Sequence, residues 1–217
     1  MRVKLKQPVL QGNDAAARTN RALFERHRLP VLNLISSPGA GKTTFLERWL
    51  AETDLQVGVI EGDLATTLDA ERIAACGAEV VQINTHGACH LDATMIARAL
   101  DHFALERLDL LVIENVGNLV CPAEFDLGES LRITLLSLTE GDDKPAKYPT
   151  SFRWADAVLL TKVDLLPYLR CDLERLSGSI QALNPGVPIL YVAAQTGEGM
   201  TEWNDWLRRR LSAEGSR

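Results

Sequence analysis

Short apolar runs, separated by polar and helix-like segments, dominate the chain after Pro30. Seven of these runs have the length and the Val, Leu and Ile content of strands, and most are apolar at both even and odd positions. This pattern is typical of strands that are covered on both faces of a sheet. The runs are residues 31–36, 56–61, 79–84, 108–114, 131–138, 156–161 and 188–194.

Helical periodicity lies between these runs, for example at 43–52 and 91–105. Strands that alternate with helices form parallel sheets through right-handed crossovers. We therefore predict an α/β fold with a mainly parallel, doubly wound, seven-stranded sheet and helices on both faces. Ligands of such sheets bind beyond the carboxyl ends of the strands, so chemistry is expected in the loops that follow the seven runs.

The first run leads into the segment SSPGAGKTT at 36–44 and then into a helix, the context of a Walker A phosphate loop. Its small residues let backbone N–H groups point at a phosphate, its lysine neutralises phosphate charge, and its first threonine can ligate Mg²⁺. Ser36 departs from the motif, which has glycine there. The predicted nucleotide-binding residues of this loop are Gly39, Ala40, Gly41, Lys42, Thr43 and Thr44.

A later run ends in TKVD at 161–164, similar to the N-K-x-D guanine motif of GTPases. Asp164 is predicted to accept hydrogen bonds from the guanine N1–H and exocyclic amine, which adenine lacks, beside Lys162. Thr161 replaces the asparagine of that motif and leaves its loop-bracing contact open. The last run ends in AAQ, where the Ala194 backbone N–H is predicted to contact the guanine O6.

Carboxylates that bind Mg²⁺ and orient water are expected close to the γ-phosphate. Asp63 follows the second run and Glu114 ends the fourth, so we predict Lys42, Asp63 and Glu114 as catalytic residues and Thr43, Asp63 and Glu114 as Mg²⁺ ligands. Asp69 is the alternative to Asp63. Gly117 is predicted to donate its N–H to the γ-phosphate. No catalytic glutamine or arginine finger is evident, so hydrolysis is expected to be slow.

Cys89 and His90 follow the third run, and Cys121 comes seven residues after Glu114. Both loops open at the predicted nucleotide edge. Two thiolates and an imidazole suit Zn²⁺ or Ni²⁺ and leave a position open for exchange. From spacing alone, small buried hydrophobic cysteines remain the alternative. His86 is a candidate auxiliary ligand, and Cys76 and Cys171 are predicted to be structural.

Composition and charge exclude several classes. The 217 residues are 46% hydrophobic and 24% charged, as in one globular domain, and no apolar run is long enough to span a membrane. The net charge of −6 argues against general nucleic-acid binding, and four cysteines without close pairs suit a reducing compartment, so a cytoplasmic location is expected. Residues 1–30 carry seven basic and two acidic residues, a local +5, which leaves −11 for the remainder.

Asn13 and Asp14 are candidate caps of a weakly amphipathic helix that runs to about His27. We predict a basic helical N-terminal extension at 1–30 and a P-loop GTPase domain at 31–217. The extension is a candidate for partner docking, with a merely solvated helix as the alternative.

Six segments along the chain together resemble the hydrogenase nickel-incorporation GTPases of the HypB family. They are SSPGAGKTT, EGDLATTLDAERI, QINTHGACHLDA, IENVGNLVCPAEFDLGE, LTEGDDKPAKYP and KVDLLPYL. The resemblance implies a P-loop GTPase that uses GTP and Mg²⁺, dimerises in the GTP state, and delivers nickel into [NiFe]-hydrogenase, directly or indirectly to its large subunit, with a HypA-type nickel metallochaperone. It also implies that Cys89, His90 and Cys121 form the metal site. The chain shows neither the CxxCGC motif nor the histidine-rich tract of some members, so nickel storage is not expected.

Two other functions stay open at this point. One is a urease-type nickel accessory GTPase, although that family has Cys-Pro-His where this chain has Cys-His-Leu. The other is a nucleotide-gated metal scaffold or store without obligatory hydrolysis. We also hypothesise that the GTP and GDP states differ in nickel affinity, because Glu114, Gly117 and Cys121 share one loop.

A homodimer contact is predicted at the apolar stretch after Asp164, with packing against the next helix of the same chain as the alternative. Two lysines of the segment EGDDKPAKYP are candidates to reach a nucleotide across that interface. The residues are Leu165, Leu166, Tyr168, Leu169, Lys144 and Lys147.

Overall fold

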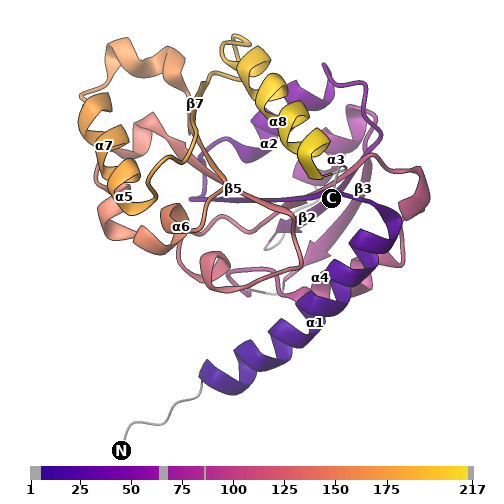
Figure 1. Ribbon diagram of the computed structural model, residues 1–217. Coiled ribbons are helices and arrows are strands. Elements are labelled where there is room, and N and C mark those ends of the chain that lie inside the picture. The colour runs from indigo at the N-terminus through magenta and orange to yellow at the C-terminus, as the bar shows by residue number, and fades with distance from the viewer. Residues whose placement is uncertain (1–5, 64–67, 86, 215–217) are drawn as a thin grey trace, which may run out of the picture.

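The computed structural model describes residues 6–63, 68–85 and 87–214, apart from the side chains of 6–9, 63 and 214. Its strands form one sheet in the order β3-β2-β4-β1-β5-β6-β7 (Figure 1), and each neighbouring pair is parallel. The predicted doubly wound sheet is confirmed. The strands are β1 (Val31–Ser36), β2 (Val57–Asp63), β3 (Glu79–Asn84), β4 (Leu110–Glu114), β5 (Leu131–Ser137), β6 (Ala157–Thr161) and β7 (Ile189–Val192).

Helices cover both faces of this sheet because most strands are apolar on both sides. The helices are α1 (Lys6–His27), α2 (Lys42–Leu50), α3 (Leu68–Ala75), α4 (Ala93–Leu100), α5 (Lys144–Lys147), α6 (Pro149–Arg153), α7 (Leu173–Leu183) and α8 (Met200–Glu214). In Figure 1, α2 and α8 lie on one side of the sheet and α1 and α4 on the other. None of the described helices has both the length and the apolar character that crossing a bilayer requires.

Three apolar clusters fix these helices on the sheet. The first joins α2, α3 and α8 to one face, where the ring of Trp203 meets Phe45 and Trp49 edge-on at centroid distances of 5.2 and 6.1 Å. The second packs α1 and α4 on the opposite face, and the third packs α6 and α7 beside it over β5 and β6. Burial of this much aromatic and aliphatic surface is the main stabilising contribution to the fold.

Helix α1 begins earlier than the predicted caps, at Lys6, and its second half packs against the domain. Asn13 lies inside the helix: its Nδ2 donates to the Asp126 carbonyl at 2.8 Å and its Oδ1 accepts from the Ala93 N–H at 2.9 Å. The prediction that Asn13 caps the helix is therefore wrong, because its side chain forms hydrogen bonds with residues that are distant in the sequence. The division at residue 30 stays a prediction, although Phe24 of α1 contributes to the buried core.

The strand order reverses direction at β1. The chain places β2, β3 and β4 on one side of β1 and then β5, β6 and β7 on the other. The loops that leave β1 and β4 therefore open at the switch point of the sheet, where ligands of doubly wound folds bind. These are the loops that carry the predicted phosphate loop and Glu114.

A nucleotide cavity beside a cysteine and histidine cluster

The loop from β1 to α2 has the backbone that a phosphate cradle needs. Gly39 and Gly41 have φ values of 72° and 92°, in the left-handed region that glycine adopts without strain, and Gly41 begins α2 as its N-cap. Lys42 follows, with only 9% of its surface exposed, and its Nζ donates to the Ser36 Oγ at 2.9 Å. Burial lowers the pKa of Lys42, and the nearby carboxyl of Glu114 opposes that shift. Ser36, the departure from the motif, thus holds the loop lysine.

Glu114 points from the end of β4 at the start of α2. Its Oε1 accepts a hydrogen bond of 2.9 Å from the Thr43 hydroxyl, and its Oε2 is buried without a hydrogen-bond partner. Burial raises the pKa of Glu114 to about 7, while the Lys42 ammonium and the Thr43 hydroxyl lower it. A buried carboxylate oxygen with no partner beside a hydroxyl is a donor set that suits Mg²⁺. The Asp63 side chain lies outside the described part of the chain.

A cavity of about 410 Å³ opens over these groups. It brings together most of the predicted phosphate-binding residues with Glu114, Gly117 and Lys162. Gly117 lies against the phosphate loop, because a Cβ on it would come within 2.9 Å of the Pro38 Cα. Asp164 and Ala194 are not among the lining residues. They follow β6 and β7, which pair at Thr161 and Val192, so both loops open at one edge.

The loop after β6 braces the phosphate loop. The Thr161 hydroxyl donates to the Ala40 carbonyl at 2.6 Å, and the Lys162 ammonium donates to the Gly39 carbonyl at 2.7 Å. Lys162 itself adopts a left-handed conformation with φ of 60°. Threonine therefore occupies the place of the motif asparagine and still contacts the phosphate loop.

Two charged residues on the cavity wall were missed by the sequence analysis. Glu61 of β2 is 3% exposed and lies opposite Glu114 in the strand register. Arg72 of α3 donates to both carboxylate oxygens of Glu47 at 2.9 and 2.5 Å and to Asp69 at 2.9 Å. Glu61 could have been identified in the sequence as a charged residue at the end of an apolar run. The ion pair of Asp69 with Arg72 could have been identified from their spacing of three residues in a helix.

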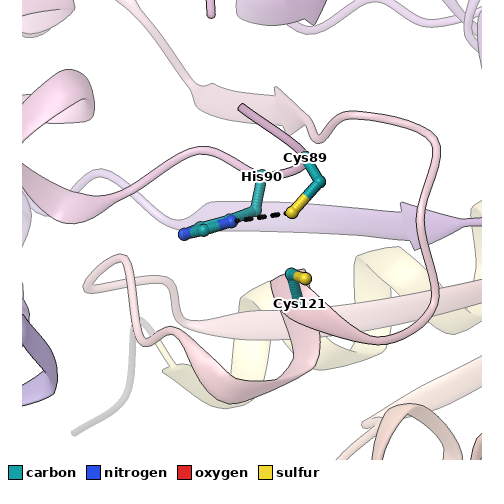
Figure 2. Close-up of side chains that lie close together, drawn as sticks. All are labelled: Cys89, His90 and Cys121. Atoms are coloured by element: carbon teal, nitrogen blue, oxygen red, sulfur yellow. Dashed lines mark hydrogen bonds between the residues drawn. The ribbon is translucent and has the colours of Figure 1, made fainter. Parts of the chain in front are cut away.

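The Cys89, His90 and Cys121 side chains lie together (Figure 2), with their ligand atoms within 4.8 Å of one another. The Cys89 Sγ and His90 Nδ1 are 3.5 Å apart. The proximity that the loop positions predicted is confirmed, whereas a role as metal ligands stays a prediction. His86 lies outside the described residues.

Neighbouring side chains orient this cluster. The Phe125 ring lies 4.0 Å from the His90 ring, tilted by 35°. Asn118 Nδ2 donates to the Cys89 carbonyl at 3.4 Å. Burial lowers the pKa of His90, which favours the neutral imidazole that binds metals, and a hydrogen bond with the Cys89 thiol raises the pKa of Cys121. The arrangement offers a soft, partly open site for a borderline cation.

The remaining predicted residues have other surroundings. Cys76 and Cys171 lie at the margins of two apolar clusters, and all four cysteines are free thiols. Leu166 and Leu169 pack against their own domain, whereas Tyr168 is 84% exposed. Lys147 forms an ion pair of 2.5 Å with Asp143.

A phosphate loop at the switch point of a parallel sheet, with a buried lysine, threonine and carboxyl, defines a P-loop nucleotide-binding protein. Over residues 30–191 the chain matches the CobW/HypB/UreG nucleotide-binding domain. It is 51% identical to hydrogenase maturation factor HypB of Azotobacter chroococcum, over 97% of this chain and 70% of that one. The chain therefore belongs to the CobW/HypB/UreG family and, within it, to the HypB hydrogenase maturation factors, as the resemblance in the sequence predicted.

Two further comparisons agree. Hydrogenase/urease maturation factor HypB of Helicobacter pylori is 41% identical over 94% of this chain and 86% of that one. The crystal structure of HypB from Helicobacter pylori in complex with nickel superposes with a TM-score of 0.89, at 41% identity, over 93% of this chain and 96% of that chain. The match thus extends over most of both chains in sequence and in structure.

Proposed function

We propose that this protein is a slow GTPase that delivers nickel during [NiFe]-hydrogenase maturation, with its metal site at Cys89, His90 and Cys121. The observation that carries this proposal is that the predicted nucleotide site and the cysteine and histidine cluster share the short segment 114–121. Glu114 at its start contacts Thr43, and Cys121 at its end joins the cluster. A segment that contributes to both sites is a direct physical route by which the nucleotide state could change the metal affinity.

The phosphate end of the cavity supports GTP binding and hydrolysis. Lys42, held by Ser36, presents buried positive charge to phosphate oxygens. The backbone N–H groups of 39–44 and the first turn of α2 add a favourable field. The hydroxyl of Thr43 and the carboxyl of Glu114 would hold Mg²⁺, with Asp63 as a third ligand. When bound, that ion supplies charge neutralisation at the phosphates.

Guanine specificity rests on Asp164 and Ala194, which follow two adjacent strands at the edge where the cavity opens. Asp164 would accept from the base N1–H and amine, and the Ala194 N–H would donate to O6. Lys162 spans from this loop to the phosphate loop, so base and phosphate contacts are held in a fixed relation. Adenine lacks both donors and would leave the carboxylate unpaired.

The cluster suits nickel as a cargo. Two thiols and one imidazole bind Ni²⁺ or Zn²⁺ well, and three protein ligands leave room for an exchange partner. Cys89 is exposed, which gives a partner access to the site. The crystallised Helicobacter pylori relative was obtained in complex with nickel, which supports the same cargo here. Zn²⁺ competes for such ligands, so both metals belong in any titration.

Membership of the HypB family supports the proposed partners and location. A HypA-type nickel metallochaperone is the expected donor or co-carrier, the hydrogenase large subunit is the direct or indirect recipient, and the cytoplasm is the expected location. The basic segment 1–30 is the candidate docking element, because Arg18 and Arg26 of α1, and Arg28 directly after the helix, are exposed to solvent.

GTP-dependent homodimerisation would use the exposed Tyr168 beside the base loop. Tyr168→Ala is expected to weaken the dimer without loss of stability, since the ring makes few contacts within its own domain. Leu165→Ala with Leu169→Ala is a less specific test, because Leu169 also packs against the domain. Light scattering with a GTP analogue distinguishes the variants, and unchanged dimerisation of Tyr168→Ala would remove this contact from the proposal.

The proposal is tested by titrating Ni²⁺ and Zn²⁺ into the GDP form and the GTP-analogue form of the full chain. We expect nickel affinities that differ between the two forms, with loss of tight binding in Cys121→Ala. Equal affinities and equal charge-transfer spectra in both forms would contradict the coupling.

A second function is a nucleotide-gated metal scaffold without obligatory hydrolysis, favoured by the absence, among the described cavity residues, of a glutamine that could orient water. Measured GTP turnover during nickel transfer separates the two functions. Urease is an additional candidate recipient, because the Helicobacter pylori relative is named a hydrogenase/urease maturation factor.

A further inference from the structure

The Asn115 carboxamide lies between the nucleotide cavity and the cysteine and histidine cluster. Asn115 is 1% exposed, directly follows Glu114 and lines the cavity. Its Oδ1 accepts two hydrogen bonds, one of 3.1 Å from the Leu91 N–H and one of 3.0 Å from the Val116 N–H. Leu91 directly follows His90, so one carboxamide oxygen joins the two loops.

The orientation of this carboxamide is fixed by its other end. Asn115 Nδ2 donates to the Asn33 Oδ1 at 3.2 Å, and Asn33 Nδ2 donates to the Glu129 Oε1 at 3.1 Å. A carboxylate can only accept, so Asn33 must direct its amide nitrogen at Glu129 and its oxygen at Asn115. Asn115 must therefore direct its oxygen at the backbone of Leu91 and Val116.

Leu91 gives the metal loop a firm anchor. Its side chain is completely buried and packs against Gly62 of β2, where an added Cβ would come within 2.8 Å of it. This packing leaves the Leu91 side chain little freedom, so the hydrogen bond from its backbone N–H to Asn115 is part of what sets the position of the adjacent His90.

The chain neighbours of Asn115 contact the predicted phosphate site. Glu114 contacts Thr43 of α2, and Gly117 lies against Pro38 of the phosphate loop. Any movement of 114–117 when the nucleotide changes must shift the Asn115 backbone, and with it the oxygen that holds Leu91. Buried hydrogen-bonded networks have few alternative arrangements, so such a shift is discrete.

We propose that Asn115 is the positioning residue that transmits the nucleotide state to the metal cluster, through its hydrogen bond to the Leu91 backbone next to His90. This inference rests on the proposed function, because it assigns a residue to the coupling proposed there. It differs from a purely structural role, in which loss of Asn115 would weaken metal binding equally in the GDP and GTP states.

The test compares the ratio of nickel affinities in the GDP and GTP-analogue forms for three full-length proteins. Wild type is expected to give a ratio in the usual range of coupled sites, roughly 5–150-fold. In Asn115→Ala the ratio falls close to one. The matched control is Asn20→Ala, which removes another buried carboxamide, one that donates to the carbonyls of Ala93 and Leu127, and retains the wild-type ratio.

The outcomes distinguish the role of Asn115 from the proposed coupling of nucleotide state to nickel affinity. If wild type shows a ratio and Asn115→Ala keeps it, this inference is wrong while the proposed function stands. A wild-type ratio of one overturns the coupling in the proposed function and the inference with it.

A second measurement uses the wild type alone, so it does not depend on whether Asn115→Ala folds. Amide hydrogen exchange at Leu91 is expected to differ between the two nucleotide forms, and identical protection in both forms contradicts the inference.

Discussion

The Thr161 hydroxyl donates a hydrogen bond of 2.6 Å to the carbonyl oxygen of Ala40 and so ties the end of β6 to the phosphate loop. The two residues are far apart in the sequence, and the acceptor lies between the two left-handed glycines of the loop. The N-K-x-D motif of GTPases has asparagine at this position, and threonine here still forms a hydrogen bond with the phosphate loop. Base-reading and phosphate-binding loops are therefore mechanically linked.

Thr161→Val is expected to loosen this link. Valine has nearly the same shape but leaves the buried Ala40 carbonyl without its partner, at a cost of about 1–2 kcal/mol in the free energy of unfolding. GTP and GDP affinities should fall together, because the loop serves both nucleotides. Urea unfolding and nucleotide titration measure the two effects. Thr161→Asn is the control, which we expect to retain both affinities, and a fully stable, tightly binding Thr161→Val would contradict the assignment.

Glu114 gives the nucleotide-free, metal-free protein a pH-dependent stability. Its pKa is raised from 4.5 to about 7 on folding. The folded state then binds more protons than the unfolded state between these values, so the stability falls as the pH rises through this window. Glu114→Gln retains an acceptor for Thr43 and lacks the charge. Relative to wild type, it should gain up to about 3 kcal/mol between pH 4.5 and 7.

Urea unfolding of both proteins in chelator, over this pH range, measures the difference. Parallel stability curves for wild type and Glu114→Gln would show that the carboxyl does not titrate in this window.

The metal cluster is tested with matched cysteine variants. Cys121→Ser removes one soft ligand, and we expect the Ni²⁺ affinity to fall by about 100-fold or more, as thiolates bind this ion far better than hydroxyls. Cys171→Ser is the control, because Cys171 is also a half-buried free thiol but lies at the margin of an apolar cluster. Equal nickel affinities of the two variants would remove Cys121 from the site.

Asp164 is tested by changing the base that it reads. Asp164→Asn replaces two acceptors with one acceptor and a donor, so guanine loses charge-assisted hydrogen bonds worth about 1.5–3 kcal/mol each. GTP affinity should fall on the order of 100-fold. Xanthosine triphosphate, which carries a carbonyl in place of the exocyclic amine, should bind the variant better than wild type. Unchanged preference for guanine in competition binding would exclude Asp164 as the base reader.

Contiguous patterns in the sequence predicted the fold and much of the site. Apolar runs without alternation predicted a sheet covered on both faces, and SSPGAGKTT carries the whole phosphate loop in one segment. The cysteine and histidine cluster was predictable because two loops at the same sheet edge carry its members. In each case the chemistry lies next to a strand end that the pattern already defined.

The parts that sequence reasoning missed depend on contacts between distant residues. Asn13 was interpreted as a helix cap, yet its partners are Asp126 and Ala93, which no local pattern identifies. The hydrogen bond from the Thr161 hydroxyl to Ala40 and the one from the Leu91 N–H to Asn115 likewise form only when the sheet has assembled. Local sequence propensity is a weak predictor wherever a buried polar side chain forms hydrogen bonds with a residue that is distant in the sequence.

The most direct test of nucleotide-controlled nickel delivery is a single-turnover experiment with nickel-loaded protein, GTP, Mg²⁺ and a chromogenic nickel acceptor. Phosphate release and nickel transfer are followed in the same sample and compared with a non-hydrolysable GTP analogue. We expect nickel to reach the acceptor on the time course of phosphate release, and to transfer more slowly with the analogue. Nickel transfer at the same rate with GTP and with the analogue would contradict the account.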